Sequence, residues 1–168
     1  APAHAFVDFL QQAGQSIWQI LPVGPTGYAD SPYQSCSAFA GNPYFIDLDL
    51  LVKDGLLKKS DFAKLSWGSD PKQVDYGTLY NQRFAVLRKA YQNFLRKRPV
   101  PGYDTPYPDD WYRFQFLSSD WLPDYCLYMA IKEENGMVDW QKWPRELRLH
   151  DAAALEAFRA EHAEQVEF

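Results

Sequence analysis

Apolar positions near the beginning of the chain follow a helical period and then form a short continuous run. Phe6, Phe9 and Leu10 repeat at three- and four-residue spacing, and Gly14 is typical of a residue that ends a helix. The next segment, residues 16–21 (SIWQIL), is apolar on both faces. Strands of a parallel sheet show this pattern because helices cover both faces of the sheet. We therefore expect one helix–strand unit of an α/β fold.

A long polar loop follows the apolar run. Its sequence begins GPTGYADSPYQ at Gly24 and continues to residue 43. In a β/α barrel, the loop after a strand lies on the face that carries active sites. Asp30 is the acid that this placement brings to that face, although an Asp before Ser-Pro is commonly a turn residue that bonds its own backbone. The loop is thus either turn chemistry alone or a surface that holds a ligand.

The remainder of the chain is predicted to be mainly helical, with no second buried strand after about residue 60. Residues 42–57 fit either a partly alternating strand or a short helix ending at Gly55. Asp120 and Asp151 are expected to cap two later helices, and the proline-rich residues 97–111 are expected to form a linker. The clearest helix carries an apolar stripe at alternating steps of four and three residues: Tyr80, Phe84, Leu87, Tyr91 and Phe94.

Composition excludes some classes of partner. A formal net charge of -5 argues against a nucleic-acid binder, which usually has a basic face. The 17% of aromatic residues is best explained by a core rich in rings, although flat rings also stack on sugars.

Cys36 and Cys126 lack metal-ligand spacing, so we expect buried thiols without a disulfide. The chain has no apolar run long enough to span a membrane, and we expect a cytoplasmic protein.

Motifs of the common catalytic and metal-binding classes are missing from the sequence. There is no nucleophile elbow, phosphate-binding Walker loop, zinc spacing or dinucleotide fingerprint. His4, His150 and His162 stand in helical or terminal contexts without a partner pattern, so each is expected to be a surface or capping residue. We therefore predict no metal site.

Four stretches of sequence carry a resemblance to a known family. They are residues 6–57, VDYGTLY at 74–80, DWLPDYCLYMAIKE at 120–133 and WQKWPRELRL at 140–149. Together they strongly resemble the amylomaltases, the 4-α-glucanotransferases also called disproportionating enzymes. The match follows the same order over nearly the whole chain, and its motifs are long.

The resemblance implies a (β/α)8 TIM barrel with helical subdomains inserted between its strands. This chain would be an α/β fragment with one helix–strand unit of the barrel and a largely helical inserted subdomain. Residues 1–58 would be the partial catalytic barrel with its substrate loop at 24–43. Residues 59–168 would be the helical insertion leading toward the next barrel strand.

The implied activity is the transfer of α-1,4-glucan segments with retention, through a covalent glucosyl-enzyme and without a cofactor. The substrates would be maltooligosaccharides and starch or glycogen-type α-glucans. In the family, an Asp nucleophile, a Glu acid/base and a second Asp lie well downstream of the matching region. We expect this chain to be a fragment with no catalytic residue, and to be inactive by itself. The alternative is a non-catalytic fragment that binds glucan or another protein.

The resemblance also implies binding residues. Asp30, Ser31 and Tyr33 of DSPYQ match the family's substrate-lining loop. Tyr28 matches a tyrosine of a second glucan-binding groove, and Tyr80 of VDYGTLY matches its partner there. The helical pattern, in contrast, puts Tyr80 at the N-terminal end of a buried stripe, so its exposure is left open.

Overall fold

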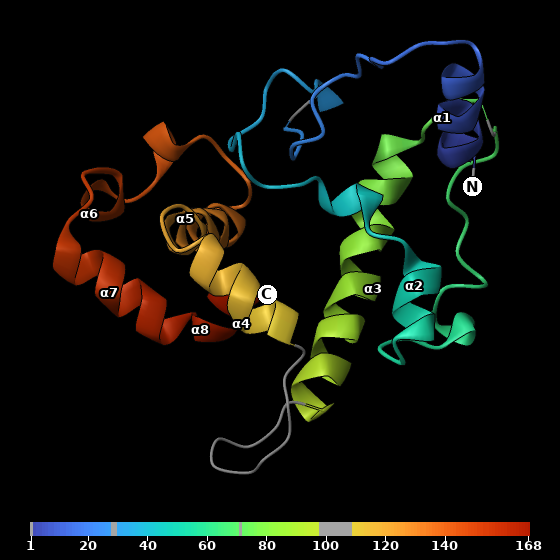
Figure 1. The fold of residues 1–168 in the computed structure, drawn as a ribbon. Helices are drawn as coiled ribbons and strands as arrows, with labels where there is room; N and C mark the ends of the chain where they lie inside the picture. Colours follow the sequence, from blue (N-terminus) through green and yellow to red (C-terminus); the bar gives the residue numbers. More distant parts are fainter. Residues whose placement is uncertain (1, 28–29, 71, 98–108) are drawn as a thin grey trace. The chain divides into compact units, whose positions relative to one another are not determined.

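The regular elements of the chain are helices. The computed structural model describes residues 2–27, 30–70, 72–97 and 109–168, and within these ranges no strand is present (Figure 1). The chain divides into two compact units, residues 1–42 and 43–168. In chain order the elements are α1 (Pro2–Gln12), η2 (Pro43–Phe45), α2 (Leu48–Lys53), η3 (Lys59–Asp61), α3 (Tyr76–Lys97), α4 (Asp109–Leu117), α5 (Leu122–Glu134), η4 (Trp140–Lys142), α6 (Arg145–Arg148), α7 (Ala152–Glu161) and α8 (Ala163–Glu167).

The first helix ends at a glycine, as predicted. Gly14 has φ +70, the left-handed conformation that glycine adopts without a steric penalty. Its N–H donates to the Gln11 carbonyl at 3.0 Å, which satisfies one of the last carbonyls of α1. The chain then turns back, and the ring of Phe6 meets the ring of Trp18 edge-on at 4.9 Å. Helix α1 is thus held to the following segment by an aromatic pair.

The predicted buried strand at residues 16–21 is not confirmed, since the described structure has no strand there. The segment has no strand hydrogen bonding, and its apolar side chains face solvent, with Ile17 85% and Ile20 57% exposed. A parallel strand needs a neighbouring strand for its hydrogen bonds and helices on both faces of the sheet. The described residues supply no second strand. The helix–strand unit of a barrel is therefore not confirmed, and the barrel stays a prediction.

The ambiguous segment at residues 42–57 contains a short helix. Asp47 caps α2 through its carboxylate, whose Oδ1 accepts hydrogen bonds from the N–H groups of Asp49 at 2.8 Å and Leu50 at 3.4 Å. Gly55, with φ +71, follows the end of the helix. The helical interpretation is therefore the correct one.

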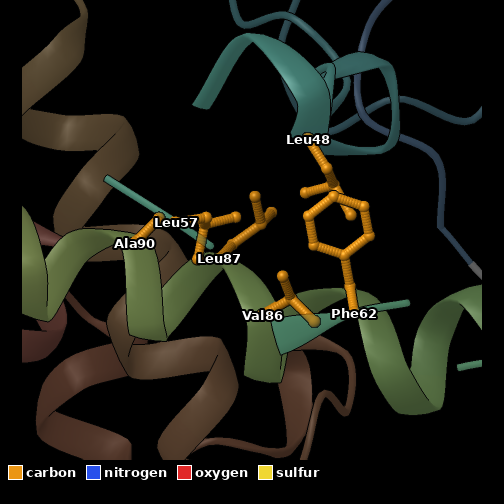
Figure 2. Packing of buried hydrophobic residues seen from close by; sticks show 6 residues of the cluster. All are labelled: Leu48, Leu57, Phe62, Val86, Leu87 and Ala90. Carbon is orange, nitrogen blue, oxygen red and sulfur yellow. The ribbon is translucent and has the colours of Figure 1, made fainter. Parts of the chain in front are cut away.

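One hydrophobic cluster joins α2 and the turns after it to α3. Figure 2 shows the side chains of Leu48 and Phe62 directed toward one another, in a cluster that also includes Leu57 and three residues of α3: Val86, Leu87 and Ala90. The predicted helix at residues 80–94 is thereby confirmed within the longer α3. The apolar stripe is buried along its middle, whereas Tyr80 near its N-terminal end is 53% exposed. The question of Tyr80's exposure is settled in favour of an outward ring.

A second hydrophobic cluster lies at α5, η4 and α7. It comprises Leu127, Ala130, Ile131, Trp143 and Phe158. Helix α8 packs beside α5 and continues the same layer after α7. The last residue of the chain also reaches α3, where the Phe168 ring lies 5.5 Å from the ring of Tyr91 and 4.3 Å from the Arg88 guanidinium.

The two predicted helix caps have opposite outcomes. Asp151 caps α7, and its Oδ1 accepts the N–H of Ala154 at 2.9 Å, so that prediction is confirmed. Asp120 does not cap α5, whose N-cap is Trp121 with no side-chain bond. The turn after α4 explains the difference, because the Ser118 carbonyl accepts the N–H of Leu122 at 2.8 Å. A first-turn donor of α5 is already satisfied by the backbone.

Several other expectations concern whole segments. The central residues 98–108 of the predicted linker lie outside the described residues, and the division into 1–58 and 59–168 stays a prediction.

Neither cysteine is in a disulfide. Cys36 is exposed rather than buried, while burial raises the pKa of the half-buried Cys126 thiol. Among the described helices, none is long and apolar enough to cross a membrane. A cytoplasmic location stays a prediction.

Candidate functional site

The predicted substrate loop is closed at its base by a backbone hydrogen bond. The Asn42 N–H donates to the Val23 carbonyl at 2.9 Å, so the two ends of the loop lie side by side. Pro25, Ala40 and Asn42 are buried, in contrast to the exposed segment that precedes the loop. Among the described residues of the first unit, the buried ones therefore lie at the base of the loop.

Gly24 makes a close approach to the opposite side of the loop. A Cβ at this position would lie 2.9 Å from the Ser35 Oγ and 3.2 Å from the Ser37 carbonyl oxygen. These separations are shorter than ordinary van der Waals contact, so only glycine fits without displacing its neighbours. Gly41, at the other end of the loop, has open space where its Cβ would be.

Two serines that the sequence analysis did not single out organise the second half of the loop. The Ser35 hydroxyl donates to the Ser37 carbonyl at 2.6 Å. The Ser37 Oγ accepts the N–H groups of Phe39 at 3.1 Å and Ala40 at 3.0 Å. Serine hydroxyls that bond nearby backbone groups in this way stabilise turns. The signal that could have revealed them is the Ser-x-Ser spacing between Pro32 and Gly41.

The predicted sugar-binding residues Asp30 and Ser31 share one turn. Asp30 has φ 55, a conformation that Asp tolerates better than most residues, and its N–H donates to the Gly27 carbonyl at 3.1 Å. Its carboxylate Oδ1 lies 3.4 Å from the Thr26 hydroxyl that donates to it. The Ser31 Oγ accepts the N–H of Tyr33 at 3.4 Å, which leaves the hydroxyl hydrogen able to donate to a ligand.

Tyr33 projects from this turn into solvent. It is 74% exposed, and its backbone is fixed by the turn in which the Gln34 N–H donates to the Ser31 carbonyl at 3.1 Å. The loop thus brings together an acceptor at Asp30, a hydroxyl at Ser31 and an aromatic face at Tyr33. Their roles in binding stay predictions.

The predicted second groove is described at one of its two residues. Tyr28 lies outside the described residues. Tyr80 belongs to the second unit, on the first turns of α3, and its ring is exposed. The pairing of Tyr28 with Tyr80 therefore stays a prediction.

An aspartate of the VDYGTLY motif fixes the helix start that carries Tyr80. The Asp75 Oδ1 accepts the Thr78 N–H at 2.9 Å, and its Oδ2 accepts the Thr78 hydroxyl at 2.8 Å. The backbone hydrogen bond from Thr78, followed by the side-chain one, lowers the pKa of the Asp75 carboxyl. The sequence analysis missed this cap, although Asp three residues before Thr in front of an apolar stripe is a recognisable signal.

The loop does not hold the pair of acids that glycoside cleavage needs. Retaining cleavage uses two carboxyl groups about 5 Å apart. Asp30 is the sole acid in the sequence between Gly24 and Pro43. Across the described residues, no group of three His, Cys, Asp or Glu side chains is placed to hold a metal ion. The chemistry that this loop supports is recognition.

Comparisons with known proteins agree with the resemblance seen in the sequence. The family model described as 4-alpha-glucanotransferase matches residues 1–168. A 4-alpha-glucanotransferase from Clostridium butyricum is 42% identical over 168 residues, which is 99% of this chain and 32% of that protein. A 4-alpha-glucanotransferase from Thermus thermophilus is 40% identical over 166 residues, or 99% of this chain and 31% of that protein.

A solved structure supports the same assignment. The structure described as amylomaltase from Streptococcus agalactiae in complex with acarbose matches with a TM-score of 0.85 and 38% identity. The match covers 99% of this chain and 32% of that one. This chain therefore spans about a third of the length of the relatives that it matches.

Proposed function

This chain belongs to the 4-alpha-glucanotransferase family, and from that membership we propose that it is the glucan-holding part of an enzyme that transfers α-1,4-glucan segments. The donors and acceptors would be maltooligosaccharides and starch or glycogen-type chains. The reaction would retain the anomeric configuration, with the catalytic carboxylates supplied by sequence outside these 168 residues. The observation that carries the proposal is the family match over the whole chain.

The loop at residues 24–43 would line the main sugar cleft. A glucose unit presents hydroxyl groups around its edge and C–H bonds on its faces. The Asp30 carboxylate and the Ser31 hydroxyl suit the edge, and the exposed ring of Tyr33 suits a face. The local bonds that fix the turn also reduce the conformational entropy lost when the sugar binds.

The barrel remains part of this proposal. Residues 16–21 would join a parallel sheet once neighbouring strands are present, because their exposed apolar side chains are those of a strand covered on both faces. Tyr28 and Tyr80 would form the second groove, which would hold long glucans. The solved amylomaltase from Streptococcus agalactiae is in complex with acarbose, which supports a carbohydrate ligand.

The decisive test is disproportionation of maltotriose by the full-length parent protein. We expect glucose and longer oligomers to appear, and their absence would overturn the enzyme proposal in favour of a non-catalytic glucan-binding or protein-interaction role. Tyr33→Ala is expected to weaken transfer about fivefold, since one aromatic contact contributes about 1 kcal/mol. Phe39→Ala is the matched control, because Phe39 is 71% exposed on the same loop and has no proposed sugar role.

A further inference from the structure

A recessed surface lies in the helical unit, and none of the residues that line it is among those assigned to glucan binding. It is a pocket of about 420 Å³ beside η2 and α2, with α3 contributing a charged side chain. This volume lies within the range of about 300–1,000 Å³ that is common for ligand sites. The residues that define its chemistry are Tyr44, Phe45, Asp47, Phe62, Trp67 and Arg83.

Arg83 is held rigidly at the wall of this pocket. Its Nη2 donates to the carbonyl oxygens of Tyr44, at 3.4 Å, and Ile46, and its guanidinium lies 5.5 Å from the centre of the Trp67 ring. Its Nε is buried and has no hydrogen-bond partner among the described residues. Burial lowers the pKa of Arg83, and the nearby Asp47 carboxylate acts in the opposite direction. The guanidinium is thus largely fixed and partly desolvated before any ligand arrives.

The charges around the pocket balance. Arg83 and Asp47 carry opposite charges, and the Asp49 carboxylate on the rim is paired with Lys59. An anion would meet two carboxylates, and a cation would meet the guanidinium. The surface therefore favours a neutral ligand that forms hydrogen bonds.

The walls of the pocket are unusually aromatic for a solvent-facing surface. Phe45 is 68% exposed, and Trp67 is half-buried with Arg83 beside its ring. Rings and charged hydrogen-bonding groups on one recessed surface suit a molecule with apolar faces and a hydroxylated edge. A hexose has that combination, whereas a purely apolar ligand would leave the charged groups without partners.

We propose that this pocket is an accessory binding site for α-1,4-glucan, in which glucose units contact Phe45 and Trp67 while their hydroxyl groups meet Asp47 and Arg83. This inference rests on the proposed function for the choice of glucan. It would add contact residues other than Asp30, Ser31, Tyr33, Tyr28 and Tyr80. Its role would be to hold a distant part of a long chain.

Hydroxyl-radical footprinting of the full-length protein with maltoheptaose tests this proposal. Transfer among glucans redistributes chain lengths but keeps α-1,4-glucan present throughout the measurement. We expect maltoheptaose to slow oxidation of Phe45 and Trp67 in a saturable manner. Leu50 is the internal control, because it is 57% exposed on α2 and does not line the pocket.

Three variants separate this site from its alternatives. Trp67→Leu should raise the concentration that half-protects Phe45 by about three- to tenfold, the effect of one aromatic contact. Leu50→Ala should leave that concentration unchanged, and an unchanged oxidation rate at Leu50 in Trp67→Leu would show that α2 remains folded. Tyr33→Ala should also leave protection of Phe45 in place, because the Asp30 loop is a different site.

Two outcomes would overturn the proposal. One is full protection of Tyr33 by maltoheptaose with no change at Phe45. The other is a Phe45 that is already unreactive in the full-length protein without glucan, which would show that a protein segment covers the pocket. Maltotriose disproportionation, measured separately, decides the proposed function, so failure of the pocket and failure of the enzyme proposal are distinguishable.

Discussion

The two units of this chain are ordered by different forces. In the first unit the buried residues gather at the base of one loop, and backbone and serine hydrogen bonds fix its course. In the second, two hydrophobic clusters hold the helices together. The loop thus depends on local geometry, and the packing of the helices depends on buried volume. We therefore expect added side-chain volume to destabilise the loop of the first unit, and removed side-chain volume to destabilise the helices of the second.

The largest expected effect is on the helical unit. Ile131 is 2% exposed in the α5 cluster, and Ile131→Ala should lower the free energy of opening α5 by about 2–5 kcal/mol because it leaves a cavity. Leu149→Ala, at a residue 60% exposed, is the control and should change it by less than about 0.5 kcal/mol. Amide hydrogen exchange in α5 measures both. Equal effects would mean that the described core does not determine stability here.

The loop should respond to added volume instead. In Gly24→Ala the new Cβ would force the Ser35 hydroxyl away from the Ser37 carbonyl and press on that carbonyl, at a cost of about 1–3 kcal/mol. Amide exchange should accelerate at Ala40, whose N–H donates to the Ser37 Oγ, and at Asn42, whose N–H donates to the Val23 carbonyl across the loop. Gly41→Ala is the matched control, since its Cβ would meet open space. If both variants exchange alike, the close approach at Gly24 does not order the loop.

A smaller effect is expected at the helix caps. Asp151→Ala should destabilise α7 by about 1 kcal/mol, because the Ala154 N–H loses its acceptor. Asp120→Ala should leave α5 unchanged, since the Ser118 carbonyl already serves that helix start. Circular dichroism during urea unfolding provides the comparison. A larger loss of stability for Asp120→Ala than for Asp151→Ala would show that Asp120 caps α5, as the sequence predicts.

The smallest effect concerns pH at the start of α3. Hydrogen bonds from Thr78 lower the pKa of Asp75 in the folded state below its ordinary value of 3.8. The unfolded chain therefore binds this proton more readily than the folded one, and stability falls as the pH decreases below about 3.8 and through the folded pKa. Amide exchange at Thr78 should accelerate in that window. Asp75→Asn keeps an acceptor but cannot titrate, so its exchange should lack this step.

Elements whose determinants are local could be predicted from the sequence. The helix ending near Gly14, the long helix through residues 80–94 and the Asp151 cap each depend on a few neighbouring residues. The strand predicted at residues 16–21 is not observed, because a strand forms only with its neighbours in a sheet and these are not determined by the local sequence. Cys36 shows the same limit, since burial depends on which distant segments cover a side chain.

The candidate site likewise has features that the sequence predicts and features that depend on contacts between distant residues. The position of the loop and its Asp30, Ser31 and Tyr33 came from motif resemblance, and the structure adds the turn that presents them. The contribution of Gly24 escaped notice because its close approach to Ser35 crosses the loop. The hydrogen bonds of Ser35 and Ser37 are local, so the spacing of these serines could have revealed them. Arg83 escaped for a similar reason, since its partners lie 37 and 39 residues earlier in the chain.

The bond between the Asn42 N–H and the Val23 carbonyl has a consequence for how this surface could be altered. Because the loop leaves and returns at one point, its tip can change in length or composition without changing the distance between its ends. The added entropy cost of a longer tip grows only with the logarithm of its length. The segment between these residues can therefore be exchanged as one unit between family members.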